Sequence, residues 1–556
     1  MQTHAEQPVV ERGIHEARAS ARRALWAIIA VSTILRLAWA AGMGAAIDEP
    51  YYFQYIQHPA LSYFDHPPMV AVVGGLGIAL AGDAFSVFGL RLGFIALFAG
   101  STWLLARLTE RFYGPRAGVL AAFTLSASGY FGMVVGTIAL PDGPLLFFWL
   151  LTLDRLAVAL NDPDRRAHWL GVGAAWGGAM LSKYHAFLLP AGALLHMVFW
   201  PPARRYLRKP GPYLAAAIGL VLFAPVIAWN ATHDWASIRF QGGRAAFSQQ
   251  IRLGELGAVL GIEALYLFPW LWAAMMVELV KLIRRRRRAW DESESFLLWQ
   301  AAPALVLFHV IATRRWIMPY WPLFGFIALL PLLGRAWAQG LKMQRRWHRI
   351  GIAAVALFPI LLAALVTAQH RFGFFEDSRG RLIGLFKPVR DFTADPSAWK
   401  QIASELERRG LLNAPQTFLF TDSWDRSASL AYATRGKAPV ACYNVEPRSY
   451  AFWSRPEDWV GRDGIFIESM RAPVARSRYH QFFARYESIG TVPIVLRGAF
   501  VGEAYLYRGT DQTRPFPFDG RFQKLAERRK LNSGSPAALG DQSIARRHDD
   551  ESRRAR

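Results

Sequence analysis

The chain is divided into apolar blocks of about 20 residues, separated by short polar or charged connections. A helix needs about 20 consecutive apolar residues to cross the hydrocarbon core of a bilayer. The pattern predicts eleven spans, at about residues 24–46, 89–107, 116–135, 144–160, 168–182, 186–200, 212–229, 257–281, 295–312, 317–334 and 349–368. The segment Met69–Ala81 is also apolar, but it is short and glycine-rich, so we expect a re-entrant or interfacial helix there.

The distribution of Lys and Arg sets the expected orientation. With the N-terminus in the cytoplasm, the cytoplasmic connections hold 25 of these residues and the outer ones 6, with those at the span ends included. Cytoplasmic loops carry such an excess in membrane proteins. If Met69–Ala81 also spanned, every later connection would change sides and the bias would largely vanish. We therefore interpret the net charge of +23 first as a signal of membrane topology and only second as a sign of nucleic-acid binding.

After the last predicted span the pattern changes to alternating strand-like and helix-like segments. TFLFTDS, PVACYN, DGIFIES and VGEAYLY are typical of strands, and 397–409 of an amphipathic helix. The predicted fold class is mainly α, a polytopic transmembrane core with a small C-terminal extracytoplasmic α/β domain. The expected divisions are a cytoplasmic segment, a membrane domain, the α/β domain and a disordered polar tail, at residues 1–23, 24–368, 369–509 and 510–556.

The outer connections gather ionisable side chains on one membrane face. They include Asp48, Glu49, Asp65 and His66 in the first, Asp142 in the second, Lys183 in the third, and His233 and Arg244 in the fourth. A carboxylate can take the proton of an attacking hydroxyl, while Lys and Arg can hold a phosphate as it leaves. This combination suits sugar transfer from a lipid-linked phosphate.

Each of these residues also has a structural interpretation. Asp48 and Asp142 precede prolines and could cap helices. Lys183 could extend its side chain from a span end to the interface. His66 and His233 could be ordinary loop residues that form hydrogen bonds. Their joint placement on one face is more informative than any single residue.

Four motifs, in order, resemble bacterial glycosyltransferases of the GT-C superfamily. The first outer loop, DEPYYFQYIQHPALSYFDHPPMVA, is similar to that of the protein O-mannosyltransferase superfamily, whose relatives include lipid A galacturonosyltransferases and aminoarabinosyltransferases. ALPDGPLLFFWLL, LSKYHAFLL and WNATHDWASIRFQ also resemble the bacterial members, and the resemblance covers about residues 24–330. In that superfamily an acidic pair follows the first span and another acid comes two spans later, which corresponds here to Asp48 with Glu49 and to Asp142.

The resemblance implies an inverting glycosyltransferase in the bacterial inner membrane, with its active site on the extracytoplasmic side. The donor would be a polyprenyl-phosphate sugar, and the acceptor lipid A, another envelope glycan or a protein. The expected roles are Asp48 as general base, Glu49 and Asp142 as groups that orient the acceptor or the base, and Lys183, Arg244 and His66 as ligands of the donor phosphate.

One motif departs from the aminoarabinosyltransferase pattern. Those enzymes tend to carry Glu-Lys-Pro where this chain has Asp65-His66-Pro67, so a permanent charge is replaced by a histidine. Some relatives bind a divalent metal near this loop, and Asp65 and His233 would be the matching ligands. Two residues are a thin set for a metal site.

The rival hypothesis is a transporter or flippase for a lipid-linked substrate. Secondary transporters tend to contain inverted repeats and ionisable groups near the bilayer midplane. The sequence shows no repeat, but Arg36, Glu263 and His309 lie inside predicted spans. A non-catalytic scaffold would leave the acidic loop unexplained.

Overall fold

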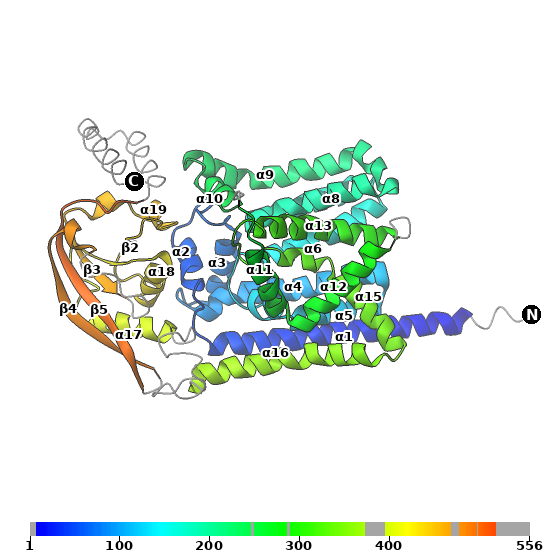
Figure 1. The fold of residues 1–556 in the computed structure, drawn as a ribbon, viewed down its shortest axis with the longest axis horizontal. Coiled ribbons are helices and arrows are strands. Elements are labelled where there is room, and N and C mark those ends of the chain that lie inside the picture. The colour runs from blue at the N-terminus through cyan, green and yellow to red at the C-terminus, as the bar shows by residue number, and fades with distance from the viewer. Residues whose placement is uncertain are drawn as a thin grey trace, which may run out of the picture.

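The computed structural model describes residues 7–245, 250–285, 290–372, 395–468, 478–496 and 499–518. Helices form a large membrane domain, and a five-stranded sheet with its own helices forms a C-terminal domain at one end of it (Figure 1). The described N-terminal end of α1 lies at the far end of the helices from the sheet (Figure 1).

Every predicted span falls on helix. The long helices are α1 Gln7–Gly42, α4 Val87–Tyr113, α5 Pro115–Ala127, α6 Asp142–Asn161, α7 Arg166–Ser182, α8 Leu188–Phe199, α9 Pro210–Thr232, α11 Leu253–Leu267, α12 Pro269–Arg284, α13 Glu292–Ala312, α15 Leu330–Lys342 and α16 Arg346–Phe372. By length and composition, seven helices of the described chain could cross a membrane, or ten if each bent pair is one span. The remaining predicted span is α7, which has 17 residues. The chain is therefore a multi-pass membrane protein.

Two of the predicted spans are bent, and a third, 186–200, ends in a sharp turn. The helix pairs are α5 with the π-helix Gly129–Val135, bent by 63°, the segment Tyr184–Phe199 with the 3₁₀ turn Pro201–Arg208, bent by 116°, and α11 with α12, bent by 109°. The last bend lies between Phe268, which has a φ of +68°, and Pro269, the first residue of α12. A proline cannot continue the hydrogen-bonded ladder of α11, so the chain starts a new helix there.

The short helix α3, Met69–Ala81, packs along the first half of α4. A Cβ on Gly77 would collide with the Gly89 carbonyl oxygen, and a Cβ on Gly93 would lie 2.6 Å from the Val73 oxygen, so glycines permit this close contact. The opposite face is apolar and exposed, at Val72, Leu76 and Leu80. At about 1.5 Å per residue, 13 residues reach only about 20 Å, less than a bilayer core.

The C-terminal domain is a mixed sheet in the order β2-β1-β3-β5-β4. Its strands are β1 Thr417–Thr421, β2 Val440–Cys442, β3 Asp463–Glu468, β4 Phe483–Leu496 and β5 Ala499–Gln512, and its helices are α17 Asp395–Arg408, α18 Trp424–Ala433 and α19 Tyr450–Trp453. β1 pairs in parallel with β2 and β3, whereas β5 pairs antiparallel with β3 and β4. The four predicted strands and the predicted helix are present, and β4 is a strand that the sequence pattern did not predict.

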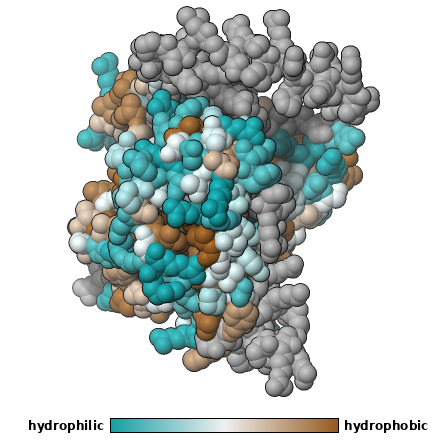
Figure 2. Space-filling view, turned by 90° about the vertical axis from the view of Figure 1, so that its left-hand side faces the viewer, coloured by the Kyte–Doolittle hydropathy of each residue, from teal (hydrophilic) through white to brown (hydrophobic). Residues whose placement is uncertain are grey.

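The two domains share hydrophobic clusters. On one side of the sheet an aromatic cluster built around Phe420 and Phe466 includes Phe64 and Ala236 of the membrane domain. The helix α2, Glu49–Gln57, packs against α18, with Tyr51 4.7 Å from the Trp424 ring. The face of the C-terminal domain that points away from the helices is mostly hydrophilic (Figure 2). The domain is thus held against α2 and the segments around Phe64 and Ala236, and its opposite face is mostly polar.

β5 extends to Gln512, beyond the expected boundary at residue 509. Phe516 and Phe518 after it are also buried in the aromatic cluster. The predicted disordered tail otherwise lies outside the described residues.

Candidate functional site

Glu49 at the start of α2 is fully buried and its carboxylate is held by four donors. Arg91 of α4 donates from Nε at 2.8 Å and from Nη2 at 2.6 Å, and the backbone N–H groups of Ala46 and Ala139 donate at 2.7 and 3.0 Å. Arg91 also donates to the carbonyl oxygens of Ala40, Met43 and Gly44, near the end of α1. The pair therefore fixes the loop that carries Asp48, and Glu49 has little capacity left for a substrate.

Asp48 occupies the N-cap position of α2, but its side chain makes no capping hydrogen bond. Its backbone carbonyl accepts the N–H groups of Tyr51 and Tyr52, so the helix starts without using the carboxylate. Burial raises the pKa of Asp48 to about 6; the positive charge of Arg448 opposes this shift, and nearby acids, Asp425 first, add to it. The capping interpretation does not account for this side chain, which is a carboxylate of raised basicity.

Asp142 and Lys183 form a buried ion pair. The Lys183 Nζ lies 2.9 and 2.8 Å from the two Asp142 oxygens, and both side chains are about 5% exposed. Lys183 follows the last residue of α7 and also lies 5.0 Å from the centre of the Tyr320 ring. Neither structural interpretation applies, because Lys183 does not reach outward to an interface and Asp142 pairs with Lys183 rather than capping α6.

His66 lies among the cations of this site. Burial lowers the pKa of His66 well below its usual value, and the charges of Lys183, Arg244 and Arg448 lower it further. Arg244, near the end of α10 (Ala236–Ala245), stacks over Trp321 at 4.7 Å. The three residues expected at the donor phosphate are thus neighbours, with His66 neutral at physiological pH.

Two tyrosines lie between Asp48 and the group formed by Asp142, Lys183, His66 and Arg244. Tyr320 lies within electrostatic reach of Asp48, Asp142 and Arg244. Tyr52 is within reach of Asp48 and Tyr320, and its ring contacts the His66 imidazole at 6.0 Å between centres. The acids and cations predicted from separate loops therefore surround one region.

Sequence reasoning missed two arginines of this region. Arg91 lies inside a predicted span, 42 residues from Glu49. Arg448 comes from the C-terminal domain and pairs with Asp65, its Nη1 lying 3.3 Å from Oδ2. Neither stands in a recognisable motif, and the chain has 64 Lys and Arg, so no local signal separated them from the rest.

The expected metal ligands do not fit a metal site. His233 stacks on Trp229 with ring centres 4.0 Å apart, and its Nδ1 lies 2.7 Å from the Trp229 carbonyl oxygen. Asp65 faces the cation Arg448, which a metal ion would repel. In the part of the chain that the structure describes, no group of three or more His, Cys, Asp or Glu could hold a metal.

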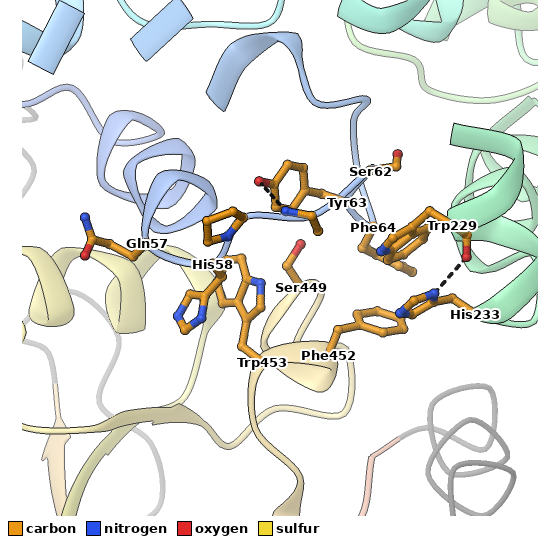
Figure 3. Close-up of a pocket in the computed structure, with 12 residues that line it drawn as sticks. Gln57, His58, Ser62, Tyr63, Phe64, Trp229, His233, Ser449, Phe452 and Trp453 are labelled. Carbon is orange, nitrogen blue, oxygen red and sulfur yellow. Dashed lines mark hydrogen bonds between the residues drawn. The ribbon is translucent and has the colours of Figure 1, made fainter. Parts of the chain in front are cut away.

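A pocket of about 360 Å³ lies beside this region, between the first outer loop, the end of α9 and α19 (Figure 3). His58 stacks on Trp453 at 4.8 Å, and Phe452 contacts the His233 ring at 5.6 Å. Ser62 and Ser449 also belong to the lining, and both are buried. The pocket presents mainly aromatic and histidine rings and, among its described residues, no Lys, Arg, Asp or Glu.

Comparisons with known proteins bear on what such a site does. Residues 65–229 match the family described as dolichyl-phosphate-mannose-protein mannosyltransferase. The chain is 25% identical over 324 residues to the lipid A galacturonosyltransferase RgtD of Rhizobium johnstonii, a match that covers 56% of this chain and 65% of that protein. The match thus spans slightly less than two thirds of the relative's length.

Solved structures show the same fold over most of the chain. ArnT from Cupriavidus metallidurans in the apo state aligns with a TM-score of 0.58 at 15% identity, covering 88% of this chain and 98% of that one. The same protein bound to undecaprenyl phosphate aligns with a TM-score of 0.53 at 16% identity, covering 87% and 97%. The comparisons confirm the resemblance to the GT-C superfamily that the four motifs indicated.

Proposed function

We propose that this chain with a GT-C fold is a membrane glycosyltransferase that moves a sugar from a polyprenyl-phosphate donor to an envelope acceptor. The observation that carries the proposal is the Asp48 carboxylate, which is half-buried, makes no capping hydrogen bond and faces the charge of Arg448, while Lys183 and Arg244 act on the nearby His66. A base next to phosphate-binding cations is the arrangement that sugar transfer from a phosphate requires. RgtD, a lipid A galacturonosyltransferase, supports the same reaction class, and ArnT, which has the same fold, binds undecaprenyl phosphate.

In the proposed reaction Asp48 accepts the proton of the acceptor hydroxyl. The hydroxyl oxygen attacks the anomeric carbon, and the bond from that carbon to the phosphate oxygen breaks with its electron pair going to the phosphate. The anomeric centre inverts. Lys183, Arg244 and His66 stabilise the charge that develops on the leaving phosphate.

Glu49 and Asp142 act as positioning residues in this mechanism. Glu49 holds the loop of Asp48 through Arg91, and Asp142 holds the Nζ of Lys183 in place. The loss of the Glu49 carboxylate would displace Asp48, and the loss of the Asp142 carboxylate would displace the Lys183 Nζ.

We assign the acceptor to the pocket beside Phe452 and Trp453. Its neutral, aromatic lining suits a saccharide, because sugar rings present apolar C–H faces to aromatic rings and hydroxyls to polar groups. The acceptor is then lipid A or another envelope glycan, or a protein, with the name of RgtD favouring lipid A.

The reaction is proposed to occur at the outer face of the bacterial inner membrane. The charge bias between connections supports this orientation. Reporter fusions after Gln57 and after Glu457 should both report the outer side, since both residues belong to the part of the molecule next to the sheet. Opposite results would refute the topology.

Arg36, Glu263 and His309, the ionisable residues inside predicted spans, all have partners on neighbouring helices. Arg36 donates to the carbonyl oxygens of Ser126 and Gly132, where α5 breaks into a π-helix. Glu263 of α11 and His309 of α13 lie 3.0 Å apart. These contacts join helices, and no observation favours transport.

Asp48→Asn tests the proposal. It keeps size and capping ability but removes the base, so we expect transfer to fall at least about 10²-fold. The matched control is Asp83→Asn, which removes an exposed carboxylate of the same outer region. Transfer would be followed with purified protein in detergent, a polyprenyl-phosphate sugar and lipid A. Near wild-type transfer by a folded Asp48→Asn protein would contradict the mechanism.

A further inference from the structure

Arg448 reaches the site from the C-terminal domain, in the connection between β2 and α19. Its guanidinium lies over the Trp424 ring at 3.8 Å, and one N–H group points to Asp65. Its Nε is buried and has no hydrogen-bond partner among the described residues. A guanidinium has five N–H donors in a fixed plane, so this one retains donors for a ligand.

The neighbouring residue fixes this segment to the catalytic loop. The Ser449 backbone N–H donates to the Tyr51 hydroxyl at 3.2 Å, and that hydroxyl donates to the Ser449 Oγ at 2.9 Å. Tyr51 lies in the first turn of α2, three residues after Asp48. The hydrogen bonds between Ser449 and Tyr51 therefore fix the position of Arg448 relative to Asp48.

The charges of the site make this cation important. Besides the ion pair of Glu49 with Arg91, the charged side chains gathered here include four carboxylates and three cations: Asp48, Asp65, Asp142, Asp425, Lys183, Arg244 and Arg448. The loss of Arg448 would change the net charge of these seven side chains from −1 to −2, and a phosphate would bind less favourably. Of the two cations that remain, Lys183 already shares its charge with Asp142.

We propose that Arg448 binds the donor phosphate, so that the C-terminal domain completes the active site of the membrane domain. The inference rests on the proposed function and names a further residue of that site. The donor phosphate carries one negative charge as a diester and gains a second when its bond to the sugar breaks. A fixed guanidinium favours the more negative state, and its planar donors match phosphate oxygens.

The test measures equilibrium binding of undecaprenyl phosphate to the purified full chain in detergent, together with transfer kinetics. Arg448→Gln should weaken binding about 10- to 100-fold, the worth of a hydrogen bond to a charged group. Arg448→Lys should recover part of the loss, because it restores the charge without the fork. The control is Arg435→Gln, an exposed arginine that pairs with Asp83 across the same domain interface, and it should stay within about twofold of the wild type.

Arg448→Gln leaves the buried Asp65 without its partner and could fail to fold. Asp65→Asn compared with Asp65→Asn/Arg448→Gln then isolates the guanidinium, since both lack that carboxylate, and the double variant should bind more weakly. Equal binding in that comparison, or in folded Arg448→Gln and wild type, overturns the inference alone. Wild-type protein that neither binds undecaprenyl phosphate nor transfers sugar overturns the proposed function as well.

Discussion

The raised pKa of Asp48 makes a quantitative prediction for the pH dependence of transfer. A general base acts only when ionised, so kcat/KM should follow the ionised fraction of Asp48 in the free enzyme. With a pKa of about 6, that fraction is about 97% at pH 7.5 and about 9% at pH 5. An aspartate at the usual value of 3.8 would still be about 94% ionised at pH 5. The rate should therefore fall about tenfold between pH 7.5 and pH 5.

Initial rates at low donor concentration, from pH 4.5 to 8.5 at constant ionic strength, measure this fall of kcat/KM towards acidic pH. Melting curves over the same range check that the protein stays folded. Among the main charges that act on Asp48, Arg448 lowers its pKa, whereas Asp425, Asp65 and Glu49 raise it. Arg448→Gln should thus move the midpoint upward, which a purely structural contact would not do. A flat profile from pH 5 to 8 in folded wild-type protein would refute the assignment of Asp48 as base.

Substitutions at three further positions test the positioning, phosphate-binding and acceptor-binding roles separately. Glu49→Gln leaves Arg91 buried and unpaired, so it should destabilise the protein by about 3–5 kcal/mol, and a melting temperature equal to that of the wild type would contradict the positioning role. Lys183→Ala should weaken donor binding and also lower stability, because Asp142 loses its partner, whereas Lys183→Arg should be milder; unchanged donor binding in both would remove Lys183 from the phosphate site. Phe452→Leu should raise the KM for a saccharide acceptor several-fold and leave binding of undecaprenyl phosphate unchanged, and an unaltered acceptor KM would detach the pocket from the reaction.

The membrane helices could be predicted because a single physical requirement, about 20 apolar residues, marks each of them. The bends could not, because they depend on how neighbouring helices pack. Pro269 is visible in the sequence, but the 109° turn before it is a tertiary property. The missed strand β4 has its first half largely exposed, so no alternation of polar and apolar residues marked it.

In the candidate site, too, residues in local motifs could be predicted, whereas residues placed by long-range contacts could not. Asp48, Asp142 and Lys183 stand in motifs at span ends, and the topology brought those ends together. Arg448 belongs to a contact with Asp65 that joins residues 383 positions apart, which no local pattern encodes. Long-range partners of this kind decide the charge balance, and only the structure revealed them.

The contact between Asp65 and Arg448 also has a consequence for biosynthesis. The chain is made from its N-terminus, so the membrane helices with Asp48, Asp142 and Lys183 are inserted before Arg448 leaves the ribosome. Until the C-terminal domain has folded and docked on α2, Asp65 lacks the guanidinium that faces it. In the proposed mechanism, a chain stalled or cut before residue 448 would therefore carry an acidic, unfinished centre that binds a lipid-linked phosphate weakly. The last domain to be made is thus the one that completes the proposed phosphate site.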